Sequence, residues 1–194
     1  MSKTLYIVAG CNGAGKTTAS FSILPNALQC REFVNADEIA RGLSPFNVEK
    51  VAIQAGRLMI QRIEELLAEG EAFAIETTLA TRSYVNLVKR AKKSGYSVQL
   101  IFFWLNSPEL AIQRIAERVG NGGHNIPENV VRRRYVSGIS NLFNLYIPIV
   151  DTWVIIDNST QPRQMVANGS AGRQSIIYNE TTFQKIQSYV REGD

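Results

Sequence analysis

The sequence has few of the residues on which disulfide-rich and zinc-dependent proteins depend. Its 194 residues include two cysteines and one histidine, too few for a disulfide framework or a Cys/His zinc site. Its longest apolar runs have the length of a strand, well short of the roughly 20 residues that cross a bilayer. The first residues lack the pattern of a signal peptide. We therefore expect a cytoplasmic protein without a membrane partner.

The chain also lacks a strong charge bias, internal repeats and low-complexity tracts. Its formal net charge of +4 suits an anionic ligand such as a nucleotide, but it is too weak to predict a nucleic-acid partner. The apolar share of 45% in a chain of this length is enough to bury the core of one domain. We expect a single domain over residues 1–194.

Strand-like apolar runs alternate with helical periodicity, which predicts an α/β fold: a mostly parallel sheet flanked by helices. All predicted strands except the second are nearly continuous apolar runs, as expected of strands buried on both faces. A short C-terminal hairpin with its turn at 167–170 should follow the sheet. The predicted strands are Thr4–Ala9, Glu32–Asn35, Ala72–Glu76, Ser97–Leu105 and Thr152–Asp157. The predicted helices cover about 48–67 and 82–94, begin at Pro108 and near Pro127, and end with 181–191.

Residues Gly10–Thr17 match the phosphate-loop pattern G-x-x-x-x-G-K-[ST]. Glycines let successive N–H groups point at an anion, and the helix that follows adds its positive end. In such loops the lysine, here Lys16, reaches the β- and γ-phosphates, and the hydroxyl of Thr17 ligates Mg²⁺. Cys11 occupies a variable position, where a small filler residue is favoured over a redox role. The context of strand, loop and helix predicts a P-loop NTPase, nucleoside-kinase-like, that binds ATP and Mg²⁺. The predicted nucleotide-binding residues of the loop are Gly10, Asn12, Gly13, Ala14, Gly15, Lys16, Thr17 and Thr18.

Polar residues follow the other predicted strands, and ligands of open α/β sheets bind beyond the carboxyl ends of the strands. Asp37 could be the general base that accepts the proton of an attacking hydroxyl, or it could cap a short helix. Glu76 could hold Mg²⁺ through water, bind a substrate hydroxyl together with Thr77 and Thr78, or be an ordinary strand-end carboxylate. Asp157 competes with Asp37 for the metal, and we favour Asp37 because it lies nearer to the loop in the sequence.

A glycine-rich segment at about 119–134 separates two predicted helices and has the character of a lid that closes over ATP. The alternative is a surface loop between solvated helix ends. Arginines flank the segment, and cations around a moving phosphoryl group stabilise its transfer. The predicted catalytic residues are Lys16, Asp37, Arg118, Arg133 and Arg134. Two further residues, Arg114 and Asn158, are predicted to bind the nucleotide.

Three blocks outside the phosphate loop resemble the zeta toxin family of P-loop kinases. They are Val34–Ala40, Glu76–Thr78 and the segment 122–135 with its Gly-Gly-His-Asn-Ile-Pro and Arg-Arg-Tyr runs. The resemblance implies a kinase that uses ATP and Mg²⁺ to phosphorylate a sugar hydroxyl of UDP-N-acetylglucosamine, with an antitoxin protein as partner.

The resemblance also implies individual roles in this sequence. Asp37 would be the base, Glu76 and Thr78 would contact the sugar, and Arg118 would be the first lid arginine. His124 stands near the place of the family's second lid arginine, so that role would fall to Arg133 or Arg134.

Two other interpretations stay open at this point. One is a P-loop kinase with a different hydroxyl-bearing acceptor, such as an antibiotic, a sugar or a nucleoside. The other is an NTP-dependent binding or switch protein without phosphoryl transfer. A GTPase switch would need an N-K-x-D motif, which the sequence lacks, and the chain is short for an AAA-type motor. The sequence does not determine the acceptor or the oligomeric state.

Overall fold

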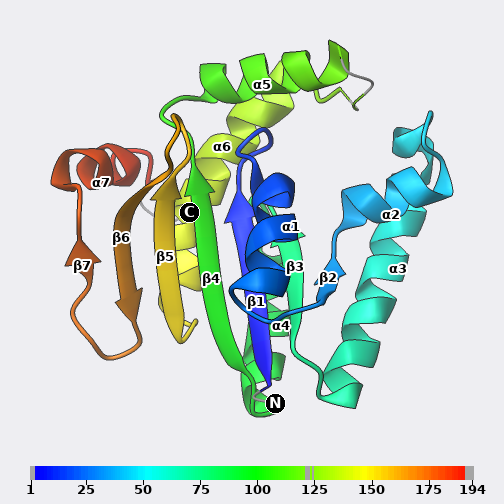
Figure 1. Cartoon of the computed structure of the whole chain (residues 1–194), viewed down its shortest axis with the longest axis horizontal. Helices are drawn as coiled ribbons and strands as arrows, with labels where there is room; N and C mark the ends of the chain where they lie inside the picture. The colour runs from blue at the N-terminus through cyan, green and yellow to red at the C-terminus, as the bar shows by residue number, and fades with distance from the viewer. Residues whose placement is uncertain (1–2, 121–122, 124, 191–194) are drawn as a thin grey trace.

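The computed structural model describes residues 3–120, 123 and 125–190. Its strands are β1 (Thr4–Gly10), β2 (Glu32–Val34), β3 (Phe73–Thr77), β4 (Ser97–Trp104), β5 (Thr152–Asp157), β6 (Gln164–Ser170) and β7 (Ile176–Ile177). Within these residues they form one sheet with the order β2-β3-β1-β4-β5-β6-β7 (Figure 1). β1 to β5 run parallel, whereas β6 and β7 are antiparallel additions. The prediction of a mostly parallel sheet is confirmed.

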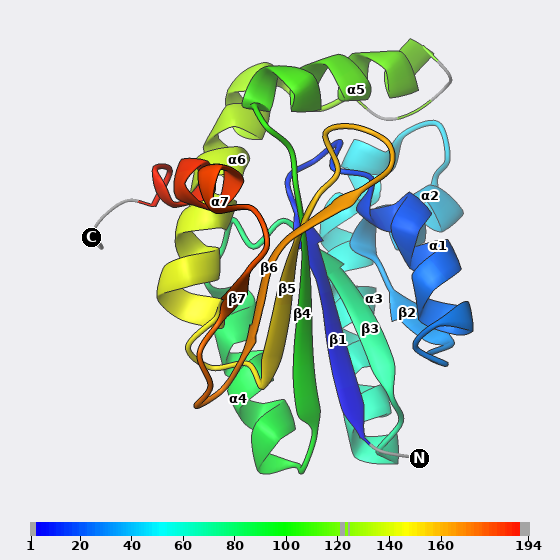
Figure 2. The same ribbon diagram turned by 60° about the vertical axis from the view of Figure 1, so that its left-hand side comes forward.

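The helices cover both faces of the sheet and cross the carboxyl ends of its strands. They are α1 (Lys16–Asn26), α2 (Ala36–Leu43), α3 (Val48–Glu69), α4 (Ser83–Lys93), α5 (Pro108–Gly120), α6 (Glu128–Asn141), a π-helical turn (Leu142–Tyr146) and α7 (Glu180–Gln187). α1 lies on one face, and α4, α6 and α7 lie on the other (Figure 2). α3 stands beside α4, where Arg90 contacts Glu64 at 2.5 Å. None of the described helices has the length and hydrophobicity of a membrane span.

Burial on both faces holds for β1, whose residues are all buried. The same expectation is wrong for the first halves of β4 and β5, where buried and more exposed residues alternate. α1 covers β1 and β3, but Figure 1 shows none of the described helices over this face of β4 and β5. An open groove of about 480 Å³ lies there instead, with Gln99, Ile101 and Val154 among its lining residues.

The C-terminal hairpin exists, but its predicted turn at 167–170 is wrong. These residues belong to β6, and the chain turns at Ala171–Gly172, where Gly172 has a φ of 73°. Gly169 pairs with Trp153 of β5, and a Cβ on Gly169 would lie 2.7 Å from the indole ring. The glycine therefore makes room for a tryptophan in the sheet and does not mark the turn. Residue 191, the predicted end of the last helix, lies outside the described residues.

Candidate functional site

The loop between β1 and α1 has backbone conformations that glycine adopts readily and other residues do not. Gly10, Gly13 and Gly15 have φ angles of 138°, 79° and 77°. A Cβ on Gly10 would lie 2.1 Å from the carbonyl oxygen of Phe103 in β4, so no side chain fits between the loop and the neighbouring strand. The glycine pattern of the motif is thus required by the geometry of the loop.

Asn158, which follows β5, supports this loop from behind. The residue is 4% exposed, and its Nδ2 donates to the carbonyl oxygen of Ala14 at 2.8 Å. Its Oδ1 accepts from Arg163 Nε at 3.2 Å. Asn158, a predicted nucleotide-binding residue, therefore holds the backbone of the loop with its side chain. Thr18, also predicted to bind the nucleotide, is exposed on α1.

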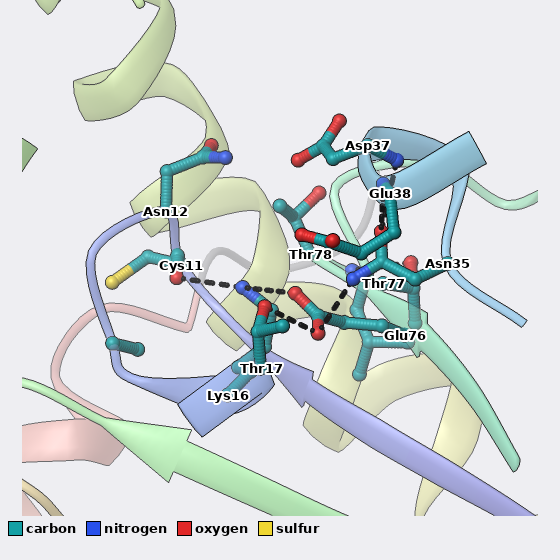
Figure 3. A network of polar contacts seen from close by, with 12 residues as sticks. Cys11, Asn12, Lys16, Thr17, Asn35, Asp37, Glu38, Glu76, Thr77 and Thr78 are labelled. Carbon is teal, nitrogen blue, oxygen red and sulfur yellow. Dashed lines mark hydrogen bonds and ion pairs between the residues drawn. The ribbon is translucent and has the colours of Figure 1, made fainter. Parts of the chain in front are cut away.

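Lys16, Thr17 and Glu76 form the polar centre of the site (Figure 3). Lys16 Nζ donates to the carbonyl oxygen of Cys11 at 3.0 Å and lies 3.6 Å from Glu76 Oε1. Thr17 Oγ1 donates to Glu76 Oε2 at 2.8 Å. The side chains of Lys16 and Glu76 are 6% and 9% exposed, so an ammonium group and a carboxylate share a largely buried site next to the phosphate loop.

The strand order explains why Glu76 reaches this position. β3 lies next to β1, and Glu76 is in register with Val8, two residues before the phosphate loop. The sequence had favoured Asp37 as the metal carboxylate because of its closeness along the chain. Among the described contacts, Glu76 is the carboxylate that meets Thr17, and Asp157 instead accepts from the backbone N–H of Ser159 at 2.8 Å. The carboxylate beside the predicted metal-binding hydroxyl of Thr17 is thus Glu76, and the metal role of Asp37 stays a prediction.

Helix α2 carries Asp37 at its second position. The alternative that Asp37 caps this helix is wrong, because the cap is Asn35, whose Oδ1 accepts from the N–H groups of Asp37 at 2.8 Å and Glu38 at 3.4 Å. The exposed carboxylate of Asp37 points away from α2, toward the side on which the phosphate loop lies (Figure 3). A carboxylate there can accept a proton from a hydroxyl bound beside the phosphate loop.

Thr77 and Thr78 follow Glu76 at the end of β3. Their hydroxyls accept hydrogen bonds from the N–H groups of Leu79 at 3.1 Å and Ala80 at 3.4 Å. Leu79 has a φ of 55°, so the two threonines stabilise a tight turn that leads away from the site. Each hydroxyl oxygen accepts one hydrogen bond in this turn, and each hydroxyl proton can still be donated to a substrate.

The predicted lid arginines occupy different surroundings. Arg134 Nη1 donates to Asn12 Oδ1 of the phosphate loop at 3.2 Å, whereas Arg133 is exposed. Arg114 donates to the carbonyl oxygen of Ser159 at 3.0 Å. The structure thus brings Arg134 to the loop and leaves Arg133 at the surface.

Arg114 and Arg118 line an open cleft of about 780 Å³ between the C-terminal half of α5 and the connection from α2 to α3. The opposite wall includes Arg41 and Phe46. Residues 121, 122 and 124 of the predicted lid lie outside the described residues, and His124 is one of them.

Cys11 lies under the loop, and its thiol is buried. Burial raises the pKa of this thiol to about 11, although the nearby positive charge of Lys16 opposes the shift. The thiol is therefore protonated at neutral pH, which agrees with a filler residue and not with a reactive nucleophile.

Comparison with known proteins gives a consistent family and fold. The family model described as Zeta toxin matches residues 1–182. A protein of Haemophilus influenzae (strain Rd), described as uncharacterized, is 33% identical over 135 residues, which cover 70% of this chain and 94% of that protein.

Two solved structures share the fold at low sequence identity. The AvrRxo1-ORF1:ORF2 complex with ATP superposes with a TM-score of 0.77 at 20% identity over 100% of this chain. This chain spans 66% of the length of that relative. The PezAT toxin-antitoxin system of Streptococcus pneumoniae superposes with a TM-score of 0.67 at 20% identity, covering 97% of this chain and 78% of that one.

Proposed function

The chain belongs to the zeta toxin family, and from that premise we propose that it is an ATP-dependent kinase with a small-molecule hydroxyl as acceptor. The observation that carries this proposal is the grouping of Lys16, Thr17 and Glu76 beside the helix that bears Asp37. A phosphate loop alone would suit many nucleotide-binding proteins. A carboxylate aimed at the same space adds the group that a hydroxyl acceptor requires.

The loop residues bind the β- and γ-phosphates of ATP through their N–H groups and through Lys16. Thr17 Oγ1 and Glu76 Oε2, 2.8 Å apart, are hard oxygen donors of the kind that Mg²⁺ takes. Thr17 would hold Mg²⁺ directly and Glu76 would hold it through water. Bound there, Mg²⁺ neutralises charge on the phosphate oxygens. The solved structure of AvrRxo1-ORF1:ORF2 with ATP supports the choice of nucleotide.

Arg41, which follows Asp37 by one turn on α2, lines the cleft between α5 and the connection from α2 to α3, so the acceptor is placed between this cleft and Asp37. Asp37 orients the acceptor hydroxyl and takes its proton as the phosphoryl group moves. Arg134, beside Asn12, and Arg118, in the cleft wall, stabilise the negative charge of the transferred group. Residues 119–134 act as the lid of a single kinase domain. From the family we take the acceptor to be a UDP-sugar such as UDP-N-acetylglucosamine, bound near Glu76, Thr77 and Thr78.

The test is transfer itself. Purified protein is incubated with Mg-ATP and UDP-N-acetylglucosamine, and new phosphomonoester is followed by phosphorus NMR. We expect a sugar phosphate with the wild type and none with Lys16→Ala. ATP consumption without any phosphorylated product, across this and other hydroxyl acceptors, would contradict the kinase assignment.

We also propose a protein antitoxin as partner, since the PezAT structure is that of a toxin-antitoxin system. Induced expression of the wild type should then slow bacterial growth, and Lys16→Ala should not. Equal growth of both strains would argue against a toxic activity and hence against a need for an antitoxin.

A further inference from the structure

The side chain of Asn35 joins two parts of the site that are distant in sequence. Its Oδ1 accepts from the N–H groups of Asp37 and Glu38 and so caps α2. Its Nδ2 donates to Glu76 Oε2 at 2.9 Å. The residue is 6% exposed, and Figure 3 shows its amide between the start of α2 and the end of β3. One amide therefore contacts both the helix of the proposed base and the proposed metal carboxylate.

Helix capping does not explain the choice of asparagine. Asp and Ser cap helices about as well as Asn, but neither presents an N–H group to a carboxylate. The bond to Glu76 uses the half of the amide that capping leaves free. The same oxygen of Glu76 also accepts from Thr17 Oγ1 at 2.8 Å, so Asn35 and Thr17 together fix the orientation of the carboxylate.

We propose that Asn35 is a positioning residue that fixes the metal carboxylate Glu76 and the base-bearing helix α2 relative to one another. The inference rests on the proposed function, because Glu76 and Asp37 receive their roles there. Partners of metal-binding side chains orient those side chains, and their loss costs about 10–100-fold in metal affinity or activity. Asn35 exerts this effect on Glu76 and, through the helix cap, on the position of Asp37.

Two substitutions separate this role from capping. Asn35→Ser keeps a good cap but removes the amide Nδ2 that reaches Glu76. Asn35→Asp keeps the cap but places a second carboxylate beside Glu76. Asn179→Ser is the matched control, because Asn179 caps α7 by accepting from the Thr182 N–H at 3.0 Å, away from the phosphate loop. A thermal melt of each variant shows how far the substitution changes the stability of the fold.

The decisive readout is the Mg²⁺ dependence of ATP binding, measured by isothermal titration calorimetry. We expect Asn35→Ser to weaken the Mg²⁺ affinity of the ATP complex by about 10-fold or more, with ATP affinity in the absence of Mg²⁺ unchanged. Asn179→Ser should leave both quantities at the wild-type values. This comparison needs no acceptor. If the wild type binds Mg-ATP but phosphorylates no UDP-sugar, the proposed acceptor is wrong. The Mg²⁺ affinities of the variants still decide the role of Asn35.

The Asn35→Asp variant loses the Nδ2 donor to Glu76 and places a second negative charge beside that carboxylate. Wild-type Mg²⁺ affinity of the ATP complex in Asn35→Ser would overturn the proposal.

Discussion

Replacing Gly15 by alanine tests whether Asn158 holds the phosphate loop in shape. A Cβ on Gly15 would lie 2.6 Å from Asn158 Nδ2, the atom that donates to the carbonyl oxygen of Ala14. Alanine at a φ of 77° costs about 1–2 kcal/mol in backbone strain. Displacing the buried amide leaves the carbonyl of Ala14 without its donor, which costs a further ~1–3 kcal/mol. Gly15→Ala should therefore lower the free energy of unfolding by about 2–5 kcal/mol.

A double-mutant cycle isolates the contribution of the amide. In an Asn158→Ala background the hydrogen bond is already lost, so Gly15→Ala should cost only the strain of about 1–2 kcal/mol. Gly172→Ala is the matched control, since Gly172 has a φ of 73° with nothing within 4 Å of an added Cβ. Urea unfolding followed by circular dichroism, without nucleotide, gives the free energies of unfolding of the wild type, the two single variants, the double variant and the control. A cost of Gly15→Ala that is the same in both backgrounds, within about 0.5 kcal/mol, would show that the amide does not support the loop.

Two further predictions concern the same end of the sheet. Arg134→Ala removes the guanidinium beside Asn12, and we expect kcat of phosphoryl transfer to fall about 10²–10³-fold. Arg132→Ala removes an exposed neighbouring arginine and should keep the wild-type kcat. Equal losses of kcat in the two variants in steady-state assays would contradict the role of Arg134. Because burial raises the thiol pKa of both Cys11 and Cys30, the folded protein should react slowly with Ellman's reagent at pH 7, and only unfolding should release two thiols. Fast reaction of either thiol in the folded protein would show that it is accessible.

The sequence predicted the elements of the site better than their arrangement. The phosphate loop was found because its glycines, lysine and threonine serve a geometry that is local in the chain. The contact of Glu76 with Thr17 was not foreseen because strand order is a long-range property: β3, not β2, lies beside β1. A strand of apolar residues that ends in an acid, Phe73–Glu76, was the available signal for Glu76. A spatial role for Asn35 could not be derived, since its second partner is 41 residues away in the chain.

Errors in the fold have the same origin. Asn168-Gly169 has the local chemistry of a turn, but pairing with β5 and the packing of Trp153 keep it inside β6. The apolar runs of β4 and β5 indicated two covered faces, whereas the helices cover one of them along part of these strands. In the hairpin a tertiary contact outweighed a local preference, and along β4 and β5 the apolar runs did not specify which face a helix covers.

The proposed function requires that one site binds Mg-ATP and transfers its γ-phosphoryl group to a hydroxyl whose proton Asp37 accepts. A single experiment can compare wild type and Asp37→Asn for Mg-ATP binding and, in the same samples, for single-turnover transfer of labelled phosphate to the acceptor. We predict equal Mg-ATP affinity and a rate of transfer that is lower by about 10²–10⁴-fold in the variant. Transfer at the wild-type rate by Asp37→Asn would show that Asp37 is not the base.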